Sequence, residues 1–104
     1  MSESPVSKLA KVLVHYSLEL KPGDQFVLRT TPLAEELSLA VYAEAVKAGA
    51  FVNVIQIIPG ADVLFYKNAS EAQLDYISPF RRFMLEKSDA FLAIDATINT
   101  RSLT

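Results

Sequence analysis

The segment QFVLRTTPLAEELSLAVYAEAVKAGAFVNVIQII, residues 25–58, predicts a strand, a helix and a second strand. The central helix has clear start and stop signals: Thr31 can cap it, Pro32 takes the first helical position, and Gly49 is placed to end it. The segment at 51–58 is almost continuously apolar and rich in β-branched residues. A strand without alternation is typical of a parallel sheet that is buried on both faces. The pattern therefore predicts a β-α-β unit.

The rest of the chain extends this unit on both sides. Ser4 and Pro5 open an amphipathic helix that packs beside the sheet, and Pro22-Gly23 suits the centre of a type II turn. The expected helices cover residues 5–20 and 32–48, and further helical pieces lie within 60–89. The expected strands cover residues 25–29, 51–58 and 90–96, so helices and strands alternate along the chain. Breaks in the helical pieces are expected at 68–70 and at 78–79. This order predicts an α/β fold with a three-strand, mostly parallel, Rossmann-like half sheet and flanking helices.

The predicted unit is unfinished. The charged side chains of the helix at 32–48 fall on one narrow stripe, formed by Glu36, Glu44 and Lys47. We therefore expect other parts of the protein to pack against this helix on more than one side. No helix follows the strand at 90–96, and three parallel strands with helices leave both edges unpaired. We expect residues 1–104 to form a single α/β subdomain of a larger domain.

Composition excludes several classes of function. The net charge is −2 with acids and bases interspersed, so neither nucleic acid nor a membrane surface is an expected partner. The chain has no cysteine, which excludes disulfides, thiolate zinc sites and cysteine nucleophiles. The N-terminus lacks the basic and apolar regions of a signal peptide, and no apolar run approaches the length of a membrane helix. The expected location is the cytoplasm.

Motifs for catalysis are missing from the sequence. Its three glycines, at 23, 49 and 60, stand too far apart for a dinucleotide fingerprint or a P-loop. The single histidine, His15, has no partner at metal-ligand spacing, so a packed or surface histidine is the simpler interpretation. The first strand ends in Arg29 and Thr30 rather than in acids, which excludes a magnesium site of the receiver type. We therefore expect neither catalytic nor metal-binding residues in this chain.

Polar residues follow the first and the last strand, where open α/β sheets bind ligands. Thr30 and Thr31 could present hydroxyls and helix N–H groups to an anion, although a simple helix cap is the favoured interpretation of Thr31. Beyond the last strand stand Asp95, Asn99 and Arg101, of which Arg101 could clamp a carboxylate. These five residues are the candidate cavity or interdomain loop. For the three after the last strand, the alternatives are a simple polar exit loop or a loop that docks on an absent domain.

Five segments, taken in their order along the chain, resemble the N-terminal region of thermophilic metallo-aminopeptidases of the aminopeptidase T and aminopeptidase S type. The resemblance extends from about Leu9 to Leu103 and rests on the turn at 20–24, the helix at 32–48 with its end at 47–50, the strand at 52–58, and the segments 69–75 and 99–103. It implies a cytoplasmic, homodimeric exopeptidase that hydrolyses N-terminal residues from peptides with two zinc or cobalt ions. It also implies that the metal ligands lie in a C-terminal domain that this chain lacks.

Two hypotheses follow. The first is an N-terminal scaffold domain of such an aminopeptidase, which is not catalytic alone and requires the missing C-terminal domain. The second is a stand-alone α/β binding module that self-associates and binds an anion or small ligand at the carboxyl ends of its strands. Peptide specificity, metal identity and oligomer geometry do not follow from the sequence.

Overall fold

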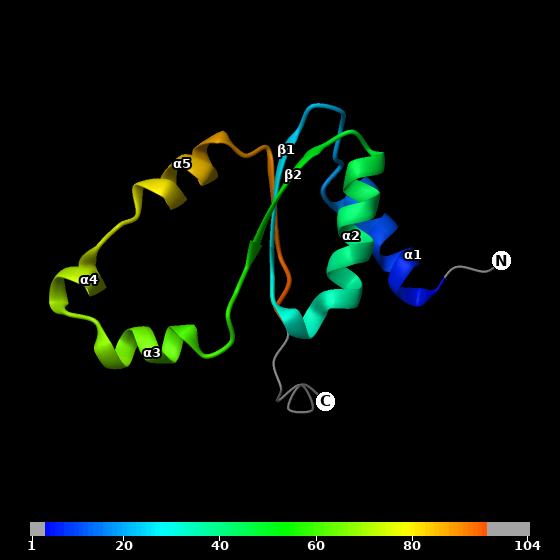
Figure 1. Cartoon of the computed structure of the whole chain (residues 1–104). Helices are drawn as coiled ribbons and strands as arrows, with labels where there is room; N and C mark the ends of the chain where they lie inside the picture. Colours follow the sequence, from blue (N-terminus) through cyan, green and yellow to red (C-terminus); the bar gives the residue numbers. More distant parts are fainter. Residues whose placement is uncertain (1–3, 96–104) are drawn as a thin grey trace.

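The computed structural model describes residues 4–95 and contains a parallel three-strand sheet at its centre (Figure 1). The strands β1 (Gln25–Thr30), β2 (Phe51–Gln56) and β3 (Ala90–Ala93) lie in the order β2-β1-β3. Both pairings are parallel, with Phe26 opposite Val52 on one side and Ala90 on the other. The predicted α/β fold with a parallel half sheet is confirmed.

The N-terminal helix differs from the expected single helix over 5–20. The α-helix α1 covers Pro5–Val12 and begins where expected, because the Ser4 side chain accepts a hydrogen bond from the Ser7 N–H. It continues as a π-helical turn, η1 (Leu13–Ser17), in which the Leu18 N–H donates to the Leu13 carbonyl at 2.8 Å. Val14 in this turn is fully buried, as is Ala10 four residues earlier in α1.

The second helix begins differently from the prediction and ends as predicted. A short 3₁₀ turn, η2 (Pro32–Ala34), precedes α2 (Glu35–Lys47). The expectation that the Thr31 side chain caps this helix is wrong: its carbonyl accepts the Ala34 N–H at 2.9 Å, and its side chain makes no capping hydrogen bond. At the other end, Gly49 has φ +89°, and the Ala50 and Gly49 N–H groups donate to Ala45 and Val46, which is a Schellman motif.

The connection from β2 to β3 contains three short helices: α3 (Ala61–Asn68), α4 (Glu71–Asp75) and α5 (Pro79–Lys87). The predicted breaks are confirmed, because Ser70 forms a capping box at the start of α4 and the Ser78 side chain accepts the Arg81 N–H at the start of α5. These helices form an arch that extends away from the sheet on the side opposite α1 and α2 (Figure 1). We call residues 57–89 the arch.

The core lies on one face of the sheet. Alternate strand residues, with Phe26 and Leu28 at the centre, pack against Val14 of η1 and Val41 of α2. The other face is covered only in part: Val27 at its centre is 2% exposed, but Phe51 on β2 is 60% exposed, so the expectation that β2 is buried on both faces is wrong. The reason is that β2 is an edge strand and the arch stands off the sheet. This open, unclosed arrangement matches the predicted partial domain.

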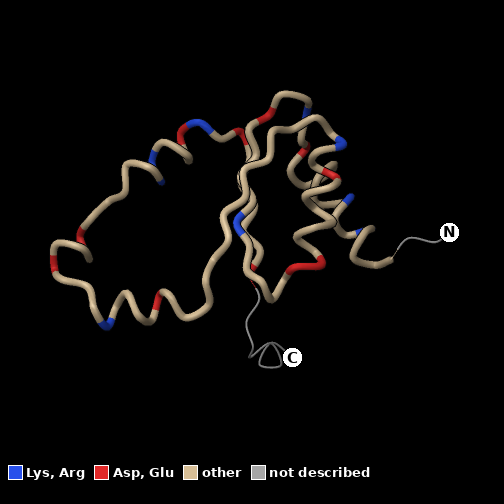
Figure 2. Tube along the Cα trace, viewed as in Figure 1, with Lys and Arg blue, Asp and Glu red and all other residues tan. Residues whose placement is uncertain are grey.

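Charged side chains are spread over the chain without a large region of one sign (Figure 2). Within residues 4–95, no helix has the length and hydrophobicity required to cross a membrane.

Candidate functional site

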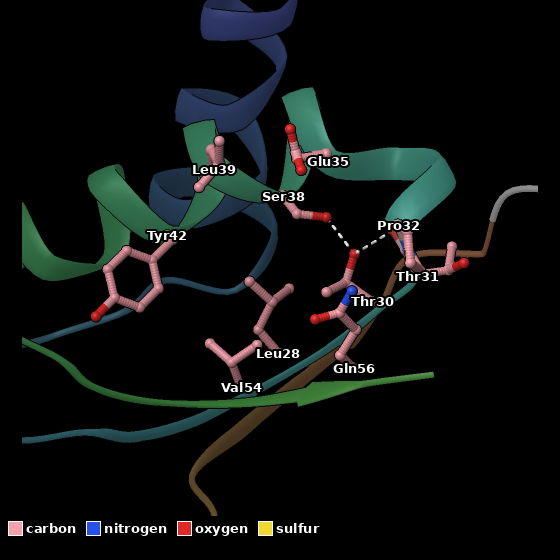
Figure 3. A pocket seen from close by; sticks show the side chains of 10 residues that line it. All are labelled: Leu28, Thr30, Thr31, Pro32, Glu35, Ser38, Leu39, Tyr42, Val54 and Gln56. Carbon is pink, nitrogen blue, oxygen red and sulfur yellow. Dashed lines mark hydrogen bonds between the residues drawn. The ribbon is translucent and has the colours of Figure 1, made fainter. Parts of the chain in front are cut away.

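A pocket of about 200 Å³ lies where β1 and β2 end and α2 begins (Figure 3). This is the sheet edge at which α/β proteins bind ligands, because the strands stop there and the following loops diverge. Its lining residues come from β1, β2, the connection through η2, and α2 as far as Tyr42: Leu28, Thr30, Thr31, Pro32, Glu35, Ser38, Leu39, Tyr42, Val54 and Gln56. We call this the strand-end pocket.

The polar floor of the strand-end pocket is satisfied internally. The hydroxyls of Thr30 and Ser38 are hydrogen-bonded to each other, and both residues are buried (Figure 3). The Ser38 hydroxyl also donates to the Ala34 carbonyl at 2.7 Å, and the Thr30 hydroxyl lies 3.4 Å from the Thr31 carbonyl. These hydroxyls therefore connect β1 to α2 through hydrogen bonds and are not free to bind an anion.

The remaining lining favours a different ligand from the expected anion. Glu35 lies in the first turn of α2, so a carboxylate already occupies the positive end of this helix. Leu28, Leu39 and Val54 supply apolar walls, and Gln56 adds an amide. The chemistry of the pocket suits a small apolar group with a hydrogen-bond donor, and it provides no nucleophile with an adjacent base.

The structure separates the predicted site residues. Thr30 and Thr31 both line the strand-end pocket, whereas Asp95 does not. The Asp95 carboxylate lies 3.8 Å from the guanidinium of Arg29, whose side chain points to the opposite face of the sheet because neighbours along a strand alternate. Asn99 and Arg101 lie outside the described residues. The structure thus brings two of the five predicted residues together.

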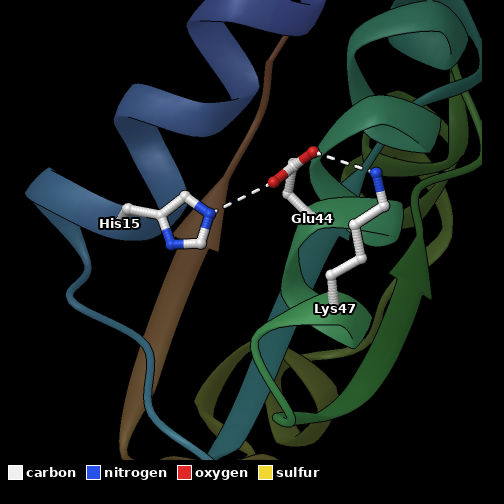
Figure 4. Close-up of polar contacts among 3 residues, drawn as sticks. All are labelled: His15, Glu44 and Lys47. Atoms are coloured by element: carbon white, nitrogen blue, oxygen red, sulfur yellow. Dashed lines mark hydrogen bonds and ion pairs between the residues drawn. The ribbon is translucent and has the colours of Figure 1, made fainter.

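A polar cluster that the sequence did not reveal joins η1 to α2 (Figure 4). His15 Nε2 lies 3.1 Å from Glu44 Oε1, and Lys47 Nζ lies 3.4 Å from Glu44 Oε2. Glu44 is buried, whereas its two partners are largely exposed. His15 and Glu44 stand 29 positions apart, so no local spacing rule could have paired them. The only sequence signal was the position of Glu44 on the narrow polar stripe.

The surroundings of Glu44 favour its charged form. Burial raises the pKa of the carboxyl, but hydrogen bonds with His15 and Lys47 and the charges of Lys47 and Lys11 lower it, and the net result is a pKa below the ordinary value. A buried carboxylate held in this way pins two helices together. We assign this cluster a structural role.

Residues 4–95 contain no group of three or more His, Cys, Asp or Glu side chains that could hold a metal ion. The cluster at Glu44 has one histidine and one carboxylate, and its third member is a lysine, which repels a cation. These residues therefore do not fit a metal centre, and no metal-dependent step is assigned to them.

Comparison with known proteins agrees with the fold. Wild-type AmpT from Thermus thermophilus matches with a TM-score of 0.65 at 19% identity, covering 91% of this chain and 25% of that chain. The chain thus corresponds to about a quarter of the length of AmpT. No curated protein matches the chain. The family model for thermophilic metalloproteases (M29) matches residues 2–104, which is almost the whole sequence, and the chain belongs to this family.

Proposed function

We propose that this chain is the N-terminal scaffold domain of a metal-dependent aminopeptidase that hydrolyses N-terminal residues from peptides. In this proposal a C-terminal domain supplies the metal ligands, and the present residues supply structure and part of the cavity wall. Two divalent ions, zinc or cobalt, would polarise the scissile carbonyl and activate water there. The present chain performs no catalytic step alone.

The match to the metalloprotease family over residues 2–104 is the observation that carries the proposal. It agrees with the coverage of AmpT, since only a quarter of that protein has a counterpart here. The half-covered sheet supports the same conclusion, because a parallel sheet is normally covered on both faces.

We propose the strand-end pocket as the contribution of this domain to the cavity. Its lining residues lie at the carboxyl ends of β1 and β2 and at the start of α2. Its apolar walls and the Glu35 carboxylate suit contact with an apolar side chain close to an N–H group of a peptide. We further propose a cytoplasmic homodimer, a state that static light scattering of the longer protein would test.

Hydrolysis of an aminoacyl anilide tests the main proposal. The 104-residue chain should be inactive with zinc or cobalt, whereas the product of a reading frame that continues beyond Thr104 should be active and should lose activity with a chelator. Leucine p-nitroanilide is a suitable reporter, because release of nitroaniline is followed by absorbance.

Activity of the 104-residue chain alone would overturn the proposal. So would a native gene in which a stop codon follows Thr104 directly. The matched control for the pocket is Leu39→Ala against Leu9→Ala in the longer protein, since both side chains are exposed but only Leu39 lines the pocket. The first variant should raise KM with little change in kcat, and the second should leave both unchanged.

A further inference from the structure

A second hollow lies between α5 and the open face of the sheet, on the opposite side from the strand-end pocket. It consists of a region of about 570 Å³ beside Val27 and Asn53 and a region of about 240 Å³ beside Arg29 and Ile55. Met84 of α5 lines both regions, so the two regions are neighbours. We call the two together the arch cleft.

All the charged side chains that line the arch cleft are cationic. Arg29 and Arg81 line the smaller region, Lys87 lines the larger one, and no Asp or Glu of residues 4–95 lines either. Three acids lie close to the lining residues in sequence or in space without lining the cleft: Glu86 between Leu85 and Lys87 on α5, Asp89 and Asp95. Asp89 accepts the Gln25 N–H at 2.8 Å, and the Asp95 carboxylate is 73% exposed.

Arg29 has a side-chain nitrogen without a partner. Its Nε is inaccessible to solvent and has no hydrogen-bond partner within residues 4–95. Arg29 forms an ion pair with Asp95, but the two side chains are 3.8 Å apart, beyond hydrogen-bond distance. A guanidinium is always charged and binds a carboxylate with two parallel hydrogen bonds, so Arg29 is suited to an external carboxylate.

Apolar side chains surround the two arginines, and the larger region adds the polar side chains of Gln25, Asn53 and Ser88; together the two regions are too large for a simple anion. Ile55, Ile57, Leu85 and Phe91 surround the two arginines, and Val27, Phe83 and Met84 extend the apolar lining toward Lys87. A small anion would fill only the region at Arg29 and leave these side chains uncovered. A segment with carboxylates between apolar side chains would match both the charge and the surface.

We propose that the arch cleft binds an acidic protein segment, with one carboxylate between Arg29 and Arg81 and apolar neighbours against Met84 and Phe91. The cleft uses the face of the sheet opposite the strand-end pocket and needs no catalytic chemistry. The open face of the sheet also supports the aminopeptidase proposal, but the test of the cleft does not depend on peptidase activity.

Peptide titration of the full 104-residue chain tests this site, with backbone amide chemical shifts as the readout. The probe is an acetylated, amidated peptide of alternating leucine and glutamate, and its control carries glutamine in place of glutamate. The acidic peptide should shift amides around Arg29, Ile55 and Met84. It should bind at least about tenfold more tightly than the glutamine peptide, because a charged hydrogen bond contributes that much.

Arg81→Gln and Arg82→Gln form a matched pair of variants. The two arginines are neighbours on α5 and both exposed, but only Arg81 lines the cleft. Arg81→Gln should weaken the acidic peptide about tenfold, and Arg82→Gln should leave its affinity unchanged. Because Arg81 lies on an exposed helix, this test does not depend on a change at the half-buried Arg29.

Three results would overturn the proposal. They are equal binding of the glutamine peptide, equal weakening by the two arginine variants, and binding of acetate alone as tightly as the acidic peptide. The last result would identify a site for free anions instead of a docking site for a protein segment. None of these readouts depends on peptidase activity, so failure here is distinguishable from failure of the proposed function.

Discussion

The two faces of the central sheet differ sharply although they belong to the same strands. Phe26 points to the face covered by η1 and α2 and is fully buried, whereas Phe91 on the other face is 37% exposed. The covered face is completed by helices that lie close to the sheet. The other face depends on the long β2-to-β3 connection, whose helices stand away from it.

The arch is unlike the packed half in the side chains that it exposes. Tyr66, Tyr76, Phe80 and Phe83 are all exposed, and no residue of α3, α4 or α5 is buried. Ordinary monomers rarely leave so much apolar surface together, and such surface usually marks an interface. The comparison teaches that local caps and turns specify where these helices begin and end, whereas their cover depends on residues elsewhere.

Truncation of a core side chain should show the largest difference between the two halves. Phe26→Ala should lower the free energy of unfolding by about 3–5 kcal/mol, because the side chain is fully buried and leaves a cavity. Phe83→Ala on the arch should cost less than about 0.5 kcal/mol. Urea denaturation followed by circular dichroism measures both; equal costs would mean that the arch is packed in solution.

A methyl group at Gly49 should have a smaller but clear effect. The residue has φ +89°, and a Cβ there would lie 3.0 Å from the Cα and Cβ of Pro22, so Gly49→Ala should cost about 2–3 kcal/mol. Gly60, at the start of the arch, has φ +91° but no atom within 4 Å of such a Cβ. Gly60→Ala should therefore cost only about 1 kcal/mol in the same urea experiment, from the backbone alone.

Glu44→Gln should lower the free energy of unfolding by about 1 kcal/mol at neutral pH, because it weakens the contacts with His15 and Lys47. The pKa of Glu44 is lower in the folded chain, so its contribution is complete above the unfolded pKa and is lost as the pH falls through the folded value. The difference between the two proteins should shrink below about pH 4.3.

Urea titrations at pH 7 and at pH 3 measure this change. Glu36→Gln is the control, since Glu36 is exposed on the same helix, and it should change the stability by less than about 0.5 kcal/mol. A difference for Glu44→Gln that grows as the pH falls would contradict the assignment.

The smallest effect on stability is expected at Phe80, which is 84% exposed on α5. Phe80→Ser should change the free energy of unfolding by less than about 0.5 kcal/mol while reducing the fluorescence of a bound hydrophobic dye. Leu9→Ser on α1, where the apolar side chain is exposed but isolated from the arch, is the control for dye binding. Unchanged fluorescence for Phe80→Ser would mean that the arch covers itself in solution.

Much of the fold was predictable because its signals are local. The helix starts at Ser4 and Ser78, the capping box at Ser70 and the end at Gly49 each depend on a few neighbouring residues. The predicted cap at Thr31 failed because its carbonyl starts a 3₁₀ turn instead. Thr30 and Thr31 were predictable as pocket residues, since the carboxyl ends of parallel strands share one edge.

The other features depend on contacts between distant parts of the chain. The pairing of His15 with Glu44 and the unpartnered Nε of Arg29 follow from how η1, α2 and the strands come together. The exposure of β2 also escaped prediction, because an apolar strand has the same sequence whether or not a neighbour covers it.

The sequence by itself determined the order of helices and strands, the parallel β-α-β unit and the lack of a local catalytic motif, because periodicity, caps and residue types act over short distances. Only the tertiary structure decided which face of the sheet is covered, which polar side chains contact each other, and where the strand-end pocket and the arch cleft lie. Those properties arise from packing between residues far apart in the chain. The open face beside the arch is the clearest case, since its apolar residues predict burial and only their arrangement reveals that their cover is absent from residues 4–95.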